Sequence, residues 1–109
     1  MIRSTLALLL LSMPLAAQDF DGQYQISQCT PGPSDSQMSI RGDRIEFWES
    51  SCEMSNPVDL RDMGQATLYD LKCTGEGEEW SDRVLLMEGV EADLIMLREG
   101  FVSFYQRCN

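Results

Sequence analysis

Apolar and polar residues alternate in short runs along most of the chain, and glycine, proline, serine or aspartate separates the runs. An alternation of period two is typical of a strand with one buried face, whereas no run keeps the period of a helix. The pattern therefore predicts an all-β domain, with a helical domain as the alternative. We expect strands or strand pairs over residues 22–29, 38–50, 66–73, 80–88 and 93–108.

Short connections between these runs predict how the strands pair. Gly42-Asp43 lies between two β-prone runs, and glycine at the first turn position suits a type II′ hairpin. A second hairpin is expected about Glu99-Gly100, because apolar runs flank it on both sides. Strands that follow one another through short turns give an antiparallel meander. We expect six to eight strands, curled into a small barrel or a flattened sandwich.

The segment 52–64 is harder to assign. Pro57 argues against a central strand, because proline cannot donate a ladder hydrogen bond. The segment is therefore expected to be an edge strand, or else a crossing loop with a helical turn near residues 60–63.

The first 17 residues have the layout of a secretory signal peptide. Arg3 supplies the positive charge, residues 6–11 form an apolar run, and Pro14 precedes small residues up to Ala17. The run is too short to span a membrane, which takes about 20 apolar residues. We expect cleavage after Ala17 or one residue earlier, with a retained N-terminal anchor as the alternative. Gln18 stands where a lipoprotein would have cysteine, so no lipid anchor is expected. The mature protein is then residues 18–109, a length that predicts one domain.

Four cysteines follow the signal peptide. An even number in a short exported chain indicates disulfides, which a domain of this size needs for stability. Their spacing contains no CxxC-type pair, which argues against a zinc site. Of the three possible pairings we expect Cys29–Cys52 and Cys73–Cys108, one bond in each half of the chain. The protein is then expected to be periplasmic or secreted.

The charge balance restricts the partners. All 18 acidic residues and 7 of the 8 basic ones lie after the signal peptide, so the mature net charge is 7 − 18 = −11. Nucleic acid and anionic membrane surfaces are excluded as partners, because both require a basic surface. A basic protein would be attracted. The alternative is that the charge only keeps the protein soluble.

Most catalytic chemistry is excluded by composition. The chain has no histidine, which removes Ser-His-Asp triads, Cys-His pairs and histidine-based metal sites. Lys72 is the only lysine and has no recognisable catalytic partner. A pair of carboxylates acting as acid and base is the one route left. We therefore expect a protein that is not an enzyme and holds no metal or cofactor, and whose five mature methionines fill the core rather than bind copper.

Residues 73–80, CTGEGEEW, are the strongest candidate for a binding site. Glycines followed by glutamates do not suit a phosphate loop, which needs a cation, and the calcium-loop spacing is absent. We expect a hairpin loop with exposed charges. Its sharper interpretation is a recognition loop formed by Glu76, Glu78 and Glu79, with Trp80 as an aromatic anchor or, alternatively, as a core residue.

Trp48 is the second candidate anchor. The strand before it would place Ile45 and Phe47 on one face, and Glu46 and Trp48 on the other. If Trp48 lies on the solvent face beside Glu46 and Glu49, it marks a contact patch.

Three segments carry a resemblance to other proteins: RIEFWESSCEM at 44–54, LYDLKCTGEGEEW at 68–80 and YQRC at 105–108. Together with the signal peptide, they resemble small secreted proteins of alphaproteobacteria, a resemblance that implies no particular activity. The chain is more distantly similar to periplasmic lysozyme inhibitors, which implies a small disulfide-bonded β-barrel. The inhibitors' loop rich in serine, glycine and tyrosine has no counterpart here, so this similarity rests on architecture and charge.

The sequence thus predicts a non-catalytic binding module, with a basic cell-wall hydrolase as its candidate partner. The first alternative is a carrier of a small ligand or cation, with the barrel interior as its pocket. The second is a small hydrolase that uses paired carboxylates.

Overall fold

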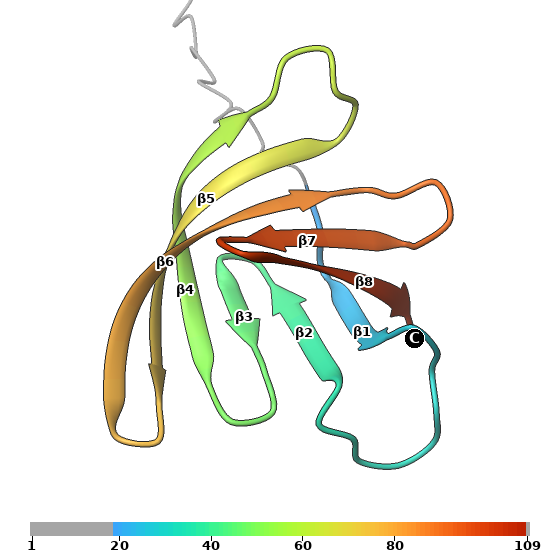
Figure 1. Ribbon diagram of the computed structural model, residues 1–109, viewed down its shortest axis with the longest axis vertical. Helices are drawn as coiled ribbons and strands as arrows, with labels where there is room; N and C mark the ends of the chain where they lie inside the picture. The colour runs from blue at the N-terminus through green and yellow to red at the C-terminus, as the bar shows by residue number, and fades with distance from the viewer. Residues whose placement is uncertain (1–18, 109) are drawn as a thin grey trace, which may run out of the picture.

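The computed structural model describes residues 19–108, and the predicted signal peptide, residues 1–17, lies outside them. Eight strands and no helix occupy this part of the chain, so the all-β prediction is confirmed (Figure 1). None of these residues forms a helix that could cross a membrane. The strands are β1 Gly22–Ile26, β2 Gln37–Arg41, β3 Arg44–Glu46, β4 Ser51–Asp59, β5 Ala66–Gly75, β6 Glu78–Met87, β7 Leu94–Arg98 and β8 Phe101–Arg107.

The strands form one closed barrel in chain order. Each strand pairs antiparallel with the next, and β8 pairs antiparallel with β1 through three residue pairs, among them Ile26 with Tyr105. Of the two predicted architectures, the barrel is therefore the correct one. Closure leaves few unpaired strand edges, which is how small antiparallel folds avoid edge-to-edge aggregation.

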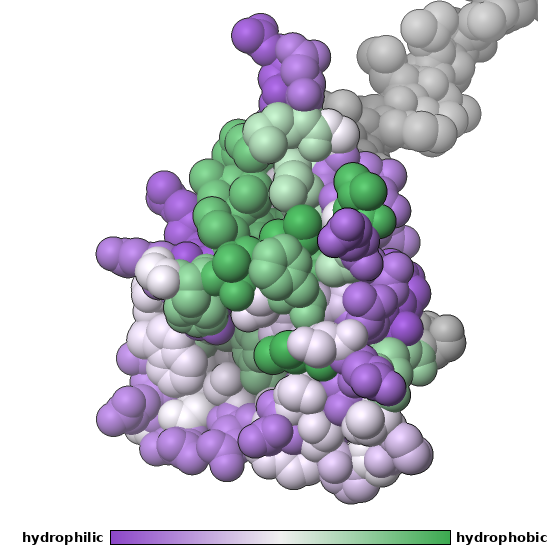
Figure 2. All heavy atoms as spheres, turned by 45° about the vertical axis from the view of Figure 1, so that its right-hand side comes forward, coloured by the Kyte–Doolittle hydropathy of each residue, from purple (hydrophilic) through white to green (hydrophobic). Residues whose placement is uncertain are grey.

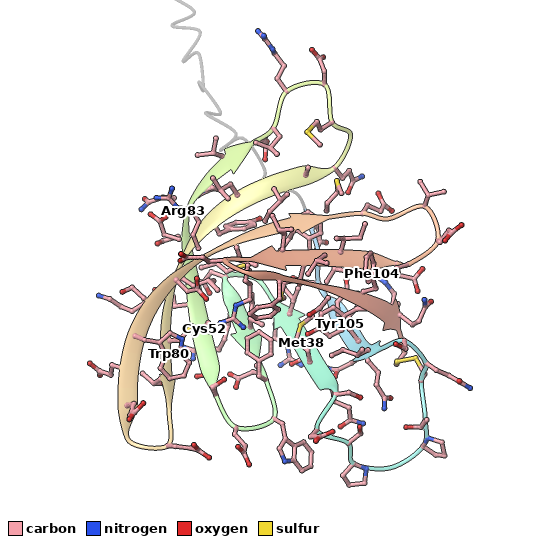
Figure 3. The ribbon with its side chains drawn as sticks, in the orientation of Figure 1. Met38, Cys52, Trp80, Arg83, Phe104 and Tyr105 are labelled. Carbon is pink, nitrogen blue, oxygen red and sulfur yellow. A yellow bond between two sulfur atoms is a disulfide. The ribbon has the colours of Figure 1, made fainter. Side chains whose placement is uncertain are left out.

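Large side chains fill the inside of the barrel. Tyr24 and Tyr105 meet edge to face, with ring centroids 6.3 Å apart. Figure 3 shows Met38, Cys52 and Tyr105 among the strands, and the three residues are at most 4% exposed. The inward residues of the described chain pack as one core. The core consists of Phe20, Tyr24, Met38, Ile40, Ile45, Cys52, Met54, Tyr69, Leu71, Cys73, Val84, Leu86, Leu94, Met96 and Tyr105.

Three tight turns have the backbone that their sequences predict. Gly42 has φ 61°, and it opens the turn between β2 and β3 as a type II′ turn requires. In the turn between β5 and β6, both Glu76 (φ 50°) and Gly77 (φ 81°) adopt positive φ, which is the signature of type I′. The turn at Glu99-Gly100 joins β7 to β8, as expected.

The ambiguous segment 52–64 is mostly strand. β4 pairs with β5 along its length but with β3 only up to Glu53, so its second half is an edge. Pro57 lies in that half, at a register shift between Ser55 and Val58, and Asn56 there has φ 53°. The edge-strand alternative is therefore correct, and residues 60–65 form turns and bends rather than a helical turn.

The predicted disulfide pairing is wrong. The bonds are Cys52–Cys73 and Cys29–Cys108. Cys52 and Cys73 lie opposite each other on β4 and β5, with Cα atoms 4.0 Å apart. Cys29 and Cys108 lie just beyond the ends of β1 and β8, the two strands that close the barrel, so strand register rather than chain order sets the pairing. Two disulfides indicate an oxidising, extracytoplasmic environment.

Candidate functional site

The meander places every second turn at the same end of the barrel. The segments 27–36, 47–50, 76–77 and 99–100 join β1 to β2, β3 to β4, β5 to β6 and β7 to β8. Because consecutive strands are antiparallel, these four connections share one end, and the other three connections lie at the opposite end. We call the first set the acidic end, for the charges described below.

Direct contacts hold three of these turns together. A β-carbon at Gly75 would lie 2.7 Å from the carbonyl oxygen of Glu49, so the β5–β6 hairpin packs against the turn between β3 and β4 with no room for a side chain. The guanidinium of Arg98, at the end of β7, lies 5.4 Å from the ring centroid of Phe47 and 5.5 Å from that of Phe101. The end is therefore a packed surface rather than a set of independent loops.

The acidic end carries negative charge without basic residues in its turns. Carboxylates from all four connections and from the adjacent start of β6 gather there. By contrast, Arg41, Arg44, Arg61 and Arg107 lie at or near the opposite end. The carboxylates of the acidic end are Asp35, Glu49, Glu76, Glu78, Glu79 and Glu99.

Two of these carboxyls interact directly. A hydrogen bond with the Glu76 carboxyl and repulsion from its charge raise the pKa of Glu49, and Asp35 adds further repulsion. A raised carboxyl pKa means that the negative form is disfavoured where it stands. A positive group that arrived at this end would remove that penalty.

Both tryptophans of the chain belong to this end. Trp48 follows Phe47 in the turn between β3 and β4, and 52% of its surface is exposed. Trp80 pairs in register with the buried Cys73 near the tip of the β5–β6 hairpin, and 36% of its surface is exposed (Figure 3). Large aromatic side chains that stay in water beside a charged surface are typical anchors of protein interfaces.

An ion pair supports this end from within the barrel mouth. Arg98 donates hydrogen bonds of 3.0 and 2.9 Å from Nε and Nη2 to Oδ2 of Asp82, and both side chains are about one-fifth exposed. Burial would raise the pKa of Asp82, but its hydrogen bonds with the Arg83 backbone and Arg98, and the charge of Arg98, lower it overall. The pair is thus ionised at neutral pH and adds no net charge to the acidic end.

The structure brings together all five residues predicted for binding. Glu76, Glu78, Glu79 and Trp80 lie on one hairpin and Trp48 on another, at the same end of the barrel. Sequence reasoning did not assign Asp35 or Glu99 to the site, and it named Glu49 only as a neighbour of Trp48. No local motif marks these residues, because only the up-and-down topology unites turns that lie up to 70 residues apart in the chain.

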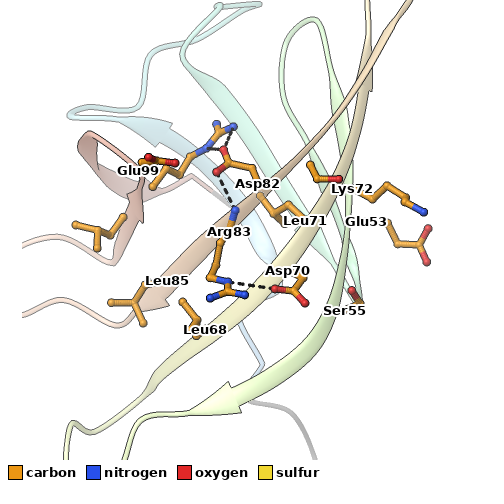
Figure 4. A pocket seen from close by; sticks show the side chains of 13 residues that line it. Glu53, Ser55, Leu68, Asp70, Leu71, Lys72, Asp82, Arg83, Leu85 and Glu99 are labelled. Atoms are coloured by element: carbon orange, nitrogen blue, oxygen red, sulfur yellow. Dashed lines mark hydrogen bonds and ion pairs between the residues drawn. The ribbon is translucent and has the colours of Figure 1, made fainter.

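A groove of about 970 Å³ lies outside the barrel, across β4 to β7 (Figure 4). Leucines line part of it, and charged side chains including the ion pair of Asp70 with Arg83 line the rest. Among residues 19–108, no three histidine, cysteine or acidic side chains are grouped so as to hold a metal ion.

Comparison of the chain with protein-family models, with curated proteins and with solved structures found no match. The resemblance to small secreted bacterial proteins and to lysozyme inhibitors therefore stays a prediction. Function has to be inferred from the chemistry of the site.

Proposed function

We propose that this protein is a non-catalytic binding module of the periplasm or the extracellular space, and that its acidic end holds a basic protein. A basic cell-wall hydrolase, which the module would inhibit by covering it, is the candidate partner. The observation that carries the proposal is the acidic end itself, where two exposed tryptophans share one end of the barrel with carboxylates from four connections.

Electrostatics supports a basic partner. The carboxylates lie on turns that hold one another in place, so little side-chain or loop ordering is needed when a partner binds. A hydrogen bond with Glu76 and repulsion from its charge already raise the pKa of Glu49 in the free protein, and a lysine or arginine from a partner would relieve the repulsion. A charged rim of this kind acts mainly on the rate of association and on the choice of partner.

The tryptophans would supply binding affinity, which exposed charges alone contribute only weakly. Interface affinity is concentrated in a few large side chains, with tryptophan among the most frequent. Trp48 precedes Glu49 in its turn, and Trp80 follows Glu79 at the start of β6, so each exposed tryptophan is next to an acidic residue in the chain. This combination suits a partner surface on which arginine or lysine side chains surround an apolar spot.

Capture from a periplasmic extract tests the proposal. The bait is the mature protein, compared with the triple variant Glu76→Gln, Glu78→Gln and Glu79→Gln. The matched control is Asp62→Asn, Glu88→Gln and Glu91→Gln, which removes three exposed charges from the opposite end. All three baits should melt at similar temperatures, because every substituted side chain faces water.

We expect the mature protein and the control to retain the same basic proteins, and the variant at the acidic end to lose them. Retention should weaken as salt rises, because exposed charges are screened over about 8 Å at physiological ionic strength. If all three baits retain the same proteins, the acidic end is not the contact. Retention of acidic proteins alone would contradict the choice of partner.

A further inference from the structure

Seven apolar side chains form two adjacent rows on the outer surface of β5 to β8. In the first row, Leu68, Leu85, Leu97 and Val102 are neighbours in register across the four strands. In the second row, Met87, Ile95 and Phe104 are neighbours across β6, β7 and β8. We call these seven residues the apolar face. Figure 2, which turns the β7–β8 side forward, shows apolar side chains gathered between hydrophilic ones.

These strands are apolar on both sides. Val84, Leu86, Leu94 and Met96, which alternate with residues of the apolar face, are fully buried in the core. A strand of an antiparallel sheet with one face in water normally carries polar residues on that face. Here Val102 and Phe104 are instead 43% and 52% exposed. Apolar side chains that gather on a surface in this way mark an interaction site.

The apolar face merges with the external groove. Its three leucines line one part of the groove, and seven charged residues line most of the rest: Glu53, Asp70, Lys72, Asp82, Arg83, Arg98 and Glu99 (Figure 4). Asp70 and Arg83 are neighbours in register and form an ion pair of 3.2 Å. Glu53 and Lys72 are also neighbours in register, on β4 and β5. Val102 and Phe104 project beside the groove, from β8.

The charge of this surface favours a second copy over other partners. The net charge of the groove is 3 − 4 = −1, against −11 for the whole mature chain. Two copies that approach through the groove therefore repel each other less than they would through the acidic end, whose turns carry carboxylates and no basic residue. An anionic membrane is repelled by the rest of the molecule, and a basic partner is drawn more strongly to the acidic end. Alternating signs in the groove also let an acidic group of one copy meet a basic group of the other.

We propose that the apolar face and the groove together form the interface of a symmetric dimer. In a two-fold interface the same patch is used twice, so Val102 and Phe104 of each copy enter the leucine-lined part of the other copy's groove. The apolar face and the groove together span five strands, β4 to β8, and four outward positions along β6, from Ser81 to Met87. With strands about 4.8 Å apart and outward residues about 6.7 Å apart, this surface covers roughly 650 Å² per copy. Two copies then bury about 1,300 Å², within the range of stable specific interfaces.

This dimer has a salt dependence opposite to that of partner capture. The two copies carry a large like charge outside the interface, and salt screens that repulsion. Self-association should therefore strengthen as salt rises, whereas binding of a basic protein at the acidic end weakens. Glu99 belongs to both surfaces, but Glu76, Glu78 and Glu79 lie outside the groove, so substitutions at the hairpin tip test the proposed function without changing the dimer interface.

Sedimentation equilibrium of the mature protein over a concentration series tests the proposal. The variant is Val102→Glu, and the matched control is Val90→Glu, at a fully exposed valine in the turn between β6 and β7. We expect a dimer for the wild type and the control. The variant should dissociate on the order of 100-fold more readily, because it removes a buried side chain and places a charge in the interface.

A measurement without substitution covers the possibility that Val102→Glu fails to fold. On dilution of the wild type, methyl NMR signals of Leu85, Leu97 and Val102 should shift, and those of Val90 should not. A wild type that stays monomeric at every concentration and salt overturns the proposal. So does a dimer that Val102→Glu leaves unchanged, or a monomer that binds phospholipid vesicles or another protein through this face.

Discussion

The disulfide between Cys29 and Cys108 joins the two ends of the strand order, and its removal should weaken the whole barrel. The perturbation is Cys29→Ser with Cys108→Ser, at two exposed positions where little packing is lost. The bond spans 79 residues, and the chain-entropy relation for a loop of that length gives about 4.5 kcal/mol at 25 °C. The corresponding value for Cys52–Cys73, which spans 21 residues, is about 3.4 kcal/mol.

A loss of about 4.5 kcal/mol is large for a domain of this size, since the free energy of unfolding is typically about 5–15 kcal/mol. Urea unfolding followed by tryptophan fluorescence measures it. The midpoint should fall, and the m-value should rise, because the unfolded chain expands once the cross-link is gone. The single variant Cys29→Ser breaks the same bond and should lose about as much stability.

Counting free thiols separates this pairing from the one expected from sequence. In the double variant the Cys52–Cys73 bond remains, so no free thiol should be found. The alternative pairing would lose both bonds and expose two thiols. A stability loss below about 1 kcal/mol, or two free thiols, would refute the reasoning that the barrel is closed by a covalent bond across β1 and β8.

Three further predictions concern local packing and ionisation. Gly75→Ala should destabilise the fold by about 1–3 kcal/mol in urea unfolding, because its β-carbon would overlap the Glu49 backbone; a variant as stable as the wild type would contradict that contact. Glu76→Gln should lower the pKa of Glu49 in a carbon NMR titration, because the hydrogen bond between the two carboxyls and the repulsion from the Glu76 charge are removed. An unchanged pKa would show that the two carboxyls do not interact. Burial raises the pKa of all three tyrosines, so the folded barrel favours their neutral form. Stability should therefore be complete below about pH 10 and fall above it, and tyrosinate absorbance should appear only as the barrel unfolds. Gradual ionisation of the tyrosines in a folded barrel would contradict this.

The secondary structure could be predicted because it depends on local patterns. Alternation of apolar and polar residues predicted the strands, and the dipeptides Gly42-Asp43 and Glu99-Gly100 predicted two of the turns. The errors were at the boundaries. The first strand ends at Ile26 rather than at residue 29, because Ser27 adopts φ 65° and leaves the strand conformation.

The disulfides could not be predicted, because they depend on contacts that chain order does not reveal. Cys52 faces Cys73 because β4 and β5 pair in one particular register, and a shift of one residue would turn the two side chains away from each other. Cys29 meets Cys108 because the sheet closes on itself. One bond in each half of the chain would suit an open fold, and it is wrong here because closure of the barrel brings Cys29 and Cys108 together.

The candidate site could be predicted only where a local sequence pattern marks its residues. Glu76 and Trp80 belong to one turn with a recognisable sequence, so a local pattern marked them. Asp35 and Glu99 are single acids in separate turns, and only the topology brings them near the hairpin. The apolar runs on both sides of Glu99-Gly100 predicted a hairpin but not an outward apolar face, and the merger of that face with a groove required the structure.

The most direct test of the proposed function is photo-crosslinking from single positions in cells that export the protein. An aromatic photoreactive residue would replace Trp48, at the acidic end, or Val90, at the opposite end. We predict covalent adducts with a basic protein from position 48 and none with that protein from position 90. The adducts should disappear when Glu76, Glu78 and Glu79 are changed to glutamine. Adducts with one partner from position 90, and none from position 48, would contradict the claim that this barrel binds through its acidic end.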